Sequence, residues 1–444
     1  MFSAVSAIAR VFRTPDLRRK IFFTLAIIAI YRLGAHVPAP FVSFPNVQSC
    51  LQQTGSASEG LLSLVNLFSG GALLQLSIFA LGVMPYITAT IIVQLLRVVI
   101  PHFEALYKEG QAGQAKLTQY TRYLTIALAL LQSTTLVTVA RSGQLFGRTG
   151  IAECNALLTN DVWWAQLLMI ITLTAGTGLI MWFAELVTER GIGNGMSLLI
   201  FTSIAATFPS ALGSIWLARG FEVFLLVIAV GIVVIALVVF VEQSQRRIPV
   251  QYAKRMVGRR TYGGTNTYIP IKVNMAGVVP VIFASSLLYI PALIAQFNQP
   301  QAGQEPAAWV TWISQYLTRG DHPLYMLVYF LLIVGFTYFY VAITFNPVDV
   351  ADNMKKYGGF IPGIRAGRPT AEYLDYVLTR ITLPGSIYLG LIALLPLVAL
   401  ATVGANQNFP FGGASILIIV GVGLETVKQI DAQLQQRHYE GLLR

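Results

Sequence analysis

The chain has 444 residues, a formal net charge of +11 and a mean hydropathy of +0.66, and 55% of its residues are apolar while only 11% are charged. A typical soluble domain has about 45–50% apolar and about 25% charged residues, so this composition excludes a soluble globular protein. The stretches 221–241 and 325–345 are almost continuously apolar, with Glu222 as their single charged residue, which also excludes a transmembrane β-barrel with its alternating segments of about ten residues.

Ten apolar stretches predict transmembrane helices, each of which needs roughly 20 residues to cross a bilayer. In chain order, the predicted spans are residues 21–38, 74–99, 123–140, 162–183, 192–212, 221–241, 273–297, 324–346, 381–401 and 411–424. Lys and Arg residues cluster before the first span, and positive residues are retained on the cytoplasmic side of a membrane. If the spans alternate from there, 25 of the 30 Lys and Arg residues lie on that side. We therefore expect a multi-pass membrane protein with both termini in the cytoplasm.

The ten spans divide into two sets of five, and an odd number of spans gives the second set the inverted orientation, a common plan in transport proteins. The predicted organisation is a cytoplasmic segment 1–20, a first half 21–212, a second half 213–424 and a cytoplasmic tail 425–444. The sequence shows no internal repeat, so the inversion follows from the number of spans alone.

The middle of every predicted span lacks charged residues. Coupled transporters and charge-lined channels place such residues in the membrane, so both classes are disfavoured. Arg32, Glu185, Glu242 and Glu425 lie at span ends, where interfacial anchoring is the simplest interpretation. The spans also lack a nucleophile with its base, the four histidines are scattered along the chain, and no glycine cluster ends in GKS or GKT. We expect no catalytic residue, no cofactor and no metal site.

Glycine and proline interrupt two of the predicted spans. The second contains GVMPY at 82–86, and the seventh contains Gly277, Pro280 and Pro291. Such residues often serve close helix packing, but irregular backbone is also tolerated beside an aqueous cavity. Their concentration in these two spans favours a cavity between them. The preceding stretch 61–75 is too short to cross the membrane, so we interpret it either as an external surface helix or as a segment that closes the cavity.

Two predicted cytoplasmic loops are long and basic. Residues 242–272 hold seven Lys or Arg residues, and their alternating pattern predicts a β-hairpin. Residues 347–380 contain glycine and proline turns that present Arg365 and Arg368. Basic loops often only contact lipid head groups, whereas structured tips favour docking of an acidic partner such as a ribosome or a motor protein.

The two cysteines, Cys50 and Cys154, both lie in loops predicted on the external side. One interpretation is that they are unrelated small residues. The other is a disulfide, which an oxidising compartment would permit.

Seven segments follow one another in order over essentially the whole chain. They are NLFSGGALLQLSIFALGVMPYITATIIVQLL at 66–96, ERGIGNGMSLLIF at 189–201, RRIPVQYAKR at 246–255, VGRRTYGG at 257–264, YIPIKVNMAGVVPVIFASS at 268–286, FNPVDVADNMKKYGGFIPGIR at 345–365 and FGGASILIIVGV at 411–422. With these segments the chain resembles the SecY family of protein-conducting channels. The resemblance implies an all-α membrane fold of two inverted five-helix halves around a central hourglass pore. It also implies a lateral gate toward lipid between the second and seventh helices.

The resemblance further implies roles for individual residues. The waist of the pore would be an aliphatic ring of Val83, Ile87, Met196, Ile200, Ile282 and Ile418. The plug would include Asn66, Phe68, Ser69, Gly70 and Gly71, the lateral gate Thr88, Gln94 and Ile290, and the docking loops Arg255, Arg259, Arg260 and Arg365. A hydrophobic constriction resists ions by dewetting, and its non-directional contacts let any polypeptide slide through.

The partners that the resemblance implies are the membrane subunits SecE and SecG, the SecA motor, the RNA of the ribosome, an insertase such as YidC, membrane lipid and unfolded, signal-bearing polypeptides. The implied location is the bacterial plasma membrane. The implied function is passive conduction of secretory polypeptides, driven by SecA or the ribosome, with sideways release of transmembrane helices. The alternative is an inverted-repeat transporter of small solutes, which would need a binding site near the midplane.

Overall fold

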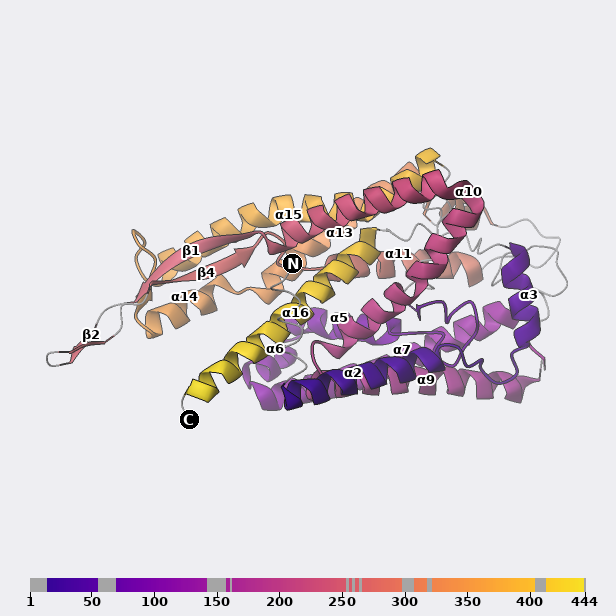
Figure 1. Ribbon diagram of the computed structural model, residues 1–444, viewed down its shortest axis with the longest axis horizontal. Helices are drawn as coiled ribbons and strands as arrows, with labels where there is room; N and C mark the ends of the chain where they lie inside the picture. Colours follow the sequence, from indigo (N-terminus) through magenta and orange to yellow (C-terminus); the bar gives the residue numbers. More distant parts are fainter. Residues whose placement is uncertain are drawn as a thin grey trace. The chain divides into compact units, whose positions relative to one another are not determined.

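The computed structural model describes residues 14–54, 69–141, 157–159, 162–252, 255–257, 260–262, 266–297, 307–317, 322–403 and 413–442. Most of these residues are helical, and the few described strands lie between residues 245 and 360 (Figure 1). The chain divides into two compact units. Unit 1 comprises Met1–Leu225, Thr402–Phe411 and Ile418–Arg444, and unit 2 comprises Leu226–Ala401 and Gly412–Leu417.

The described elements of unit 1 are helices. They are α2 (Pro15–Gly34), α3 (Phe44–Thr54), α5 (Met84–Val99), α6 (Pro101–Lys108), α7 (Gln111–Arg141), α9 (Trp163–Arg190), the first part of α10 (Gly195–Gln243) and most of α16 (Gly413–Leu442). Helix α10 is interrupted at Gly220, whose φ of 83° and ψ of 174° are not helical. This break falls between the predicted fifth and sixth spans, as the sequence indicates.

Unit 2 combines helices with strands. Its elements are the second part of α10, then β1 (Gln245–Tyr252), β2 (Arg255–Val257), β3 (Arg260–Tyr262), β4 (Asn266–Lys272), α11 (Val279–Phe297), α12 (Ala308–Tyr316), α13 (Pro323–Thr344), α14 (Pro347–Lys356), β5 (Gly359–Phe360) and α15 (Arg368–Val403). Helix α13 starts where the His322 ring nitrogen accepts the N–H of Leu324, and α14 starts where the Asn346 side chain accepts the N–H of Val348. Both side chains therefore satisfy donors that have no partner within their helix.

Six helices among the described residues are long and apolar enough to cross a membrane, or seven if α5 and α6, which meet at 101°, form one bent span. The six are α7, α9, the two parts of α10, α13 continued by α14, and α15. They cover the predicted third to sixth, eighth and ninth spans. The helical membrane fold is thus confirmed. The total of ten spans stays a prediction, as do the two halves, whose predicted boundary falls within α10.

The second predicted span begins later than the sequence indicates. Helix was predicted from residue 74, but α5 starts at Met84, and residues 69–83 are mostly consecutive turns. Positive φ angles at residues such as Gly70 and Leu76 prevent a continuous helix. These turns are largely buried, which is one condition under which irregular backbone is tolerated at membrane depth.

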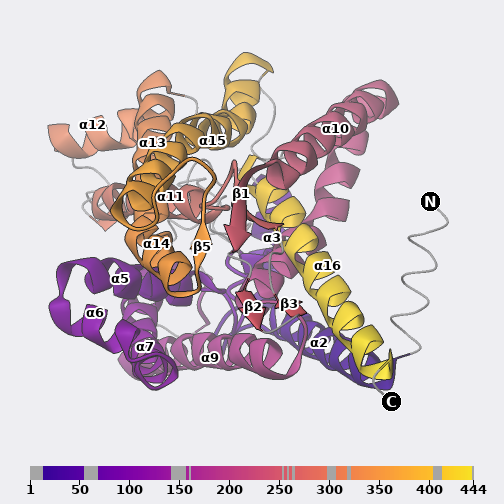
Figure 2. The same ribbon diagram turned by 90° about the vertical axis from the view of Figure 1, so that its left-hand side faces the viewer.

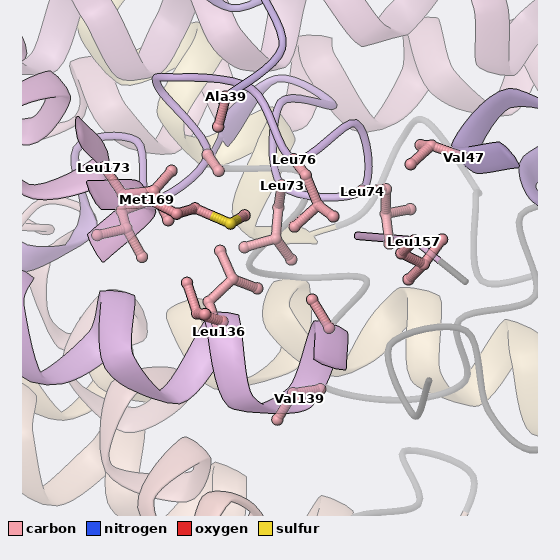
Figure 3. Packing of buried hydrophobic residues seen from close by; sticks show 14 of the residues in the cluster. Ala39, Val47, Leu73, Leu74, Leu76, Leu136, Val139, Leu157, Met169 and Leu173 are labelled. Carbon is pink, nitrogen blue, oxygen red and sulfur yellow. The ribbon is translucent and has the colours of Figure 1, made fainter. Parts of the chain in front are cut away.

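The core of unit 1 packs these turns against two helices. Leucines of the turns face side chains of α7 and α9 in one hydrophobic cluster (Figure 3). Its buried members include Leu73, Leu76, Leu136, Met169 and Leu173. Threonine hydroxyls along α7 donate to carbonyls one turn earlier, so these polar groups are satisfied within their own helix.

Unit 2 contains the predicted β-hairpin. Strands β1 and β4 pair antiparallel over seven residue pairs, and β2 and β3 form a second, shorter hairpin in the segment between them. Strand β5 comes from the other basic loop, lies beside β1 (Figure 2) and pairs with it through Gln251↔Phe360 and Tyr252↔Gly359. The resulting strand order is β4-β1-β5. The two basic loops therefore share one sheet, although they are far apart in the sequence.

The alternation of side chains along β1 explains how this sheet is held. Ile248 and Val250 are buried in a cluster that includes Leu374 of α15, because alternate residues of a strand point to opposite faces. Arg247 is exposed, and its guanidinium lies 4.8 Å from the centre of the Tyr268 ring. One face of the hairpin is thus part of the core of unit 2, and the other presents basic and aromatic groups.

Candidate pore and docking site

Four of the six predicted ring residues lie at the first turns of two helices in unit 1. Val83 directly precedes α5 and Ile87 follows one turn later, while Met196 and Ile200 have the same spacing at the start of α10. Residues four apart lie on the same face of a helix, so each helix presents a pair of apolar side chains. Val83, Ile87 and Ile200 are buried, and Met196 is half-buried.

The other two ring residues lie further along the chain. Ile282 is in α11 and Ile418 is in α16, and both are buried. Ile418 belongs to unit 1 with the four residues above, whereas Ile282 belongs to unit 2. The structure therefore gives the position and the burial of each residue, with Val83 just before α5 and the other five in helices, and their assembly into one constriction stays a prediction.

The turn between α9 and α10 explains why the helix of Met196 begins where it does. The side-chain oxygen of Asn194 accepts the N–H of Met196 at 3.1 Å, and the Thr188 hydroxyl accepts the N–H of Gly195 at 2.9 Å. These bonds satisfy donors that a helix start leaves without partners. Gly195 is required because a Cβ there would collide with the carbonyl oxygen of Ala184. The GIGNG motif thus fixes the start of α10 against α9.

The predicted plug residues are only partly described. Asn66 and Phe68 lie outside the described residues. Ser69 is fully buried, and its hydroxyl accepts the N–H of Leu73 at 3.1 Å. Gly70 and Gly71 follow in a turn and have φ angles of 68° and 89°, which only glycine adopts without strain.

Arg32 contacts this turn directly. Its Nη1 donates a hydrogen bond of 2.8 Å to the carbonyl oxygen of Gly70. The sequence indicates only an interfacial anchor at this position, which stays a prediction, and the structure adds a bond from the side chain to a backbone group 38 residues further along. An apolar span that ends in arginine gives no sequence signal for such a bond.

The predicted gate residues occupy α5 and α11. The Thr88 hydroxyl donates to the Met84 carbonyl at 3.0 Å, so this residue satisfies its hydroxyl within its own helix. Gln94 is half-buried on α5, and Ile290 belongs to α11. Because α5 lies in unit 1 and α11 in unit 2, the lateral gate itself stays a prediction.

The predicted docking residues lie in the two basic loops of unit 2. Arg255 is in β2 and Arg260 in β3, while Arg259 lies outside the described residues. Arg365 is exposed in the turns after β5, and its carbonyl oxygen accepts the Thr370 hydroxyl at 2.9 Å. The backbone at Arg365 is therefore held while its side chain faces outward.

Two further polar contacts involve acidic residues that the sequence indicates as interfacial anchors, an interpretation that stays a prediction. Glu185 of α9 accepts two hydrogen bonds of 2.8 Å from the guanidinium of Arg122 on α7. Glu242, at the end of α10, accepts a hydrogen bond of 2.6 Å from the Asn274 side chain. Both carboxylates therefore bind protein groups near the ends of spans. The contact between Arg122 and Glu185 has a sequence signal, because the basic residue and the acidic residue lie at the same end of two neighbouring spans.

The structure resolves the alternatives for the cysteines. Cys50 is fully buried and disulfide-bonded, and the only other cysteine of the chain is Cys154, which lies outside the described residues. The interpretation of two unrelated small residues is therefore wrong. Within the described parts of the chain, no group of three or more His, Cys, Asp or Glu residues could hold a metal ion.

Two solved structures match most of the chain. One is the structure of a protein-conducting channel, with a TM-score of 0.61, 19% sequence identity and coverage of 93% of this chain and 91% of that chain. The other is Sec61 in the canine ribosome-channel complex from the endoplasmic reticulum, with a TM-score of 0.57, 17% identity and the same coverage. At these identities, the two matches show a shared fold.

Sequence relatives match at much higher identity. The protein translocase subunit SecY of Streptomyces galbus is 67% identical over 444 residues, which cover 99% of this chain and 100% of that protein. The protein translocase subunit SecY of Micrococcus luteus is 61% identical over 442 residues, with the same coverage. The family model described as SecY matches residues 77–427. The chain therefore belongs to the SecY family.

Proposed function

We propose that this chain is the central, pore-forming subunit of a Sec translocon in a bacterial plasma membrane. It passes unfolded secretory polypeptides across the membrane and releases transmembrane helices sideways into lipid. The observation that carries the proposal is the 67% identity over the full length of a protein translocase subunit. The alternative of a small-solute transporter has no comparable support.

The chemistry of the predicted ring supports conduction without binding. Its members are aliphatic or methionine side chains, five of which are buried, so they offer no charged or hydrogen-bonding group to a passing chain. Such a constriction excludes ions by dewetting, and it has no preference for one polypeptide sequence over another because apolar contacts are non-directional. We expect the chain to have no catalytic activity and no cofactor of its own, so the driving force comes from a partner.

The sheet of unit 2 supports docking of that partner. Its two loops carry the predicted docking arginines, and pairing of β5 with β1 joins them in one folded element. The SecA motor and the ribosome are the two partners that would dock there, the ribosome through RNA phosphates, which basic side chains recognise. SecE and SecG would be the small membrane subunits, and an insertase such as YidC would receive released helices.

Release into lipid would occur between α5 and α11. Both helices begin after irregular segments, with positive φ at Gly82 before α5 and at Gly277 before α11. A hydrophobic segment that reaches an open gate would partition into lipid with a gain of about 25 cal/mol per Å² of apolar surface removed from water. The gate therefore needs to open but does not need to bind the segment.

Site-specific photocrosslinking tests the proposal. A crosslinking residue is placed at Ile87, Ile200 or Ile282 in the full complex, and a secretory precursor is stalled halfway across membrane vesicles. Val233 serves as the control because it is apolar and 65% exposed on α10. We expect crosslinks to the precursor from all three ring positions and none from Val233. Stalled precursor without crosslinks from the ring positions would overturn the conduit assignment.

A further inference from the structure

The segment between β4 and α11 contains a buried polar side chain that the proposed pore, gate and docking surfaces do not use. Strand β4 ends at Lys272 and α11 begins at Val279, and residues 273–278 between them form bends and turns. Asn274 lies in this segment and is only 4% exposed. Because the segment leads directly into α11, the contacts that fix it also fix where the predicted gate helix begins.

The Asn274 amide binds two groups in this region. Its Nδ2 donates a hydrogen bond of 2.6 Å to Glu242 Oε1 at the end of α10 and one of 3.2 Å to the carbonyl oxygen of Gly277. All three residues belong to unit 2. A hydrogen bond to a carboxylate is stronger than one between neutral groups, and a low-dielectric surrounding strengthens it further. One nitrogen therefore holds the end of α10 and the turn before α11 together.

The two ends of the segment differ in how they are held. Near β4, the Val273 N–H donates to the Ser244 carbonyl at 3.1 Å, and a Cβ on Gly385 of α15 would collide with the carbonyl oxygen of Val273. Near α11, Gly277 has a φ of 61°, and glycine is the residue whose backbone has most freedom to rotate. The Asn274 bond to the Gly277 carbonyl therefore acts on the more mobile end.

The contact depends on the donor of Asn274 and not on the size of its side chain. The Asn274 Oδ1 is buried and accepts no hydrogen bond from any described group, so Nδ2 alone holds the segment. Aspartate has nearly the same shape but has no donor when ionised. It would also place a second negative charge beside Glu242. An aspartate at this position is therefore the substitution that removes the contact with the least change in volume.

We infer that the Asn274 amide is the positioning group that fixes the start of α11 and thereby sets how hydrophobic a segment has to be before it leaves the channel sideways. The inference rests on the proposed function, in which release occurs beside α11. Without the Asn274 donor, the turn at Gly277 rotates more easily and α11 samples further orientations. The proposed gate then opens more often, so less hydrophobic segments are released into lipid.

The test measures sideways release by the full channel complex in membrane vesicles. A secretory precursor carries a test segment with a graded number of leucine and alanine residues, and the ratio of released to translocated chains is measured for each segment. For a segment that the parent complex divides about equally, we expect Asn274→Asp to raise this ratio about tenfold, the change that corresponds to losing one hydrogen bond to a charged group. An unchanged ratio would overturn the inference.

Exchange of the two polar groups separates this contact from a general loss of stability. In the double variant Glu242→Gln with Asn274→Asp, the amide at residue 242 is the donor and the carboxylate at residue 274 is the acceptor. The ratio should therefore return most of the way to the parent value, because the two changes are coupled through one contact. A double variant that releases as much as Asn274→Asp alone would show that the effect does not pass through this contact.

Asn346→Asp is the matched control. Asn346 also donates to a carboxylate, that of Asp349 at 2.8 Å, but it is exposed at the start of α14. This substitution should leave the release ratio unchanged, and a rise equal to that of Asn274→Asp would overturn the inference. A parent complex that translocates every test segment, however hydrophobic, would instead contradict the proposed sideways release on which the inference rests.

Discussion

Two glycine-containing stretches are not helical, residues 69–83 in unit 1 and residues 357–367 in unit 2, where the two-residue strand β5 is flanked by turns, and their surroundings are opposite. Both contain several positive φ angles. The first is largely buried and its Gly70 carbonyl is bound by Arg32, whereas the second is mostly exposed, with Tyr357 77% accessible. Backbone groups in a buried turn need partners from the protein, while water satisfies those of an exposed turn. The irregular backbone of residues 69–83 therefore depends on packing for its stability, whereas that of residues 357–367 depends on packing much less.

Leu76→Ala, in the buried stretch, is expected to lower the free energy of unfolding more than any other substitution considered. Leu76 is fully buried and keeps a φ of 47°, a conformation that is uncommon for a bulky residue and is maintained here by packing. Truncation leaves a cavity among α7, α9 and the turns, at a cost of about 2–5 kcal/mol. Thermal unfolding of the purified complex in detergent measures the loss.

Phe360→Ala is the matched truncation in the exposed stretch. The Phe360 side chain is 38% exposed, so its removal creates no enclosed cavity. We expect its effect on the unfolding temperature to be less than half that of Leu76→Ala. Equal losses for the two variants would show that burial does not distinguish the two stretches.

Gly70→Ala and Gly363→Ala compare the cost of adding a single Cβ atom in the buried stretch and in the exposed one. Both glycines have positive φ, 68° and 83°, so each alanine incurs roughly 1–2 kcal/mol of left-handed strain. At Gly363 the new Cβ meets nothing within 4 Å, whereas at Gly70 it lies 3.1 Å from Arg32 Nη1. We expect Gly70→Ala to cost more in unfolding free energy than Gly363→Ala in the same thermal unfolding measurement. Equal costs in the two variants would contradict a specific role for the Gly70 turn.

The parts of the fold that the sequence predicts are those with a strong local pattern. The alternation that places Ile248 and Val250 on one face and Arg247 on the other predicts the β1–β4 hairpin. Long apolar runs likewise predict α7, α9 and α13. Strand β5 is too short to produce such a pattern, since only Gly359 and Phe360 form it.

The start of α5 and the Arg32 contact could not be predicted for a different reason. The left-handed conformation of Leu76 has no residue-type signature, because leucine normally favours helix at that position. The bond between Arg32 and Gly70 joins residues 38 apart and depends on how α2, α10 and the turn pack together. Local patterns carry no information about such tertiary contacts.

Arg365→Glu tests the function of the exposed stretch and leaves its folding intact. The side chain is exposed, so reversing its charge should not change the unfolding temperature. Binding of SecA or the ribosome to the complex should weaken, and for the ribosome the slope of log affinity against log salt should fall by about 1. Arg368→Glu is the control because Arg368 already pairs with Glu372 at 3.0 Å. Unchanged affinity and salt slope for Arg365→Glu would remove Arg365 from the docking surface.

Glu104→Gln is expected to have the smallest effect, although its ion pair is shorter than the Arg32 contact. Lys108 Nζ lies 2.6 Å from Glu104 on the exposed helix α6, and this hydrogen bond holds the pKa of Glu104 below its ordinary value. A lowered carboxyl pKa stabilises the folded state above the unfolded pKa, and this contribution disappears as the pH falls through the folded pKa. The unfolding temperatures of the parent and Glu104→Gln should therefore coincide in acid, where Glu104 is protonated. At neutral pH they should differ only slightly, because water and salt screen an exposed ion pair. A difference as large as that of Gly70→Ala would mean that distance, and not burial, decides what a polar contact contributes in this protein.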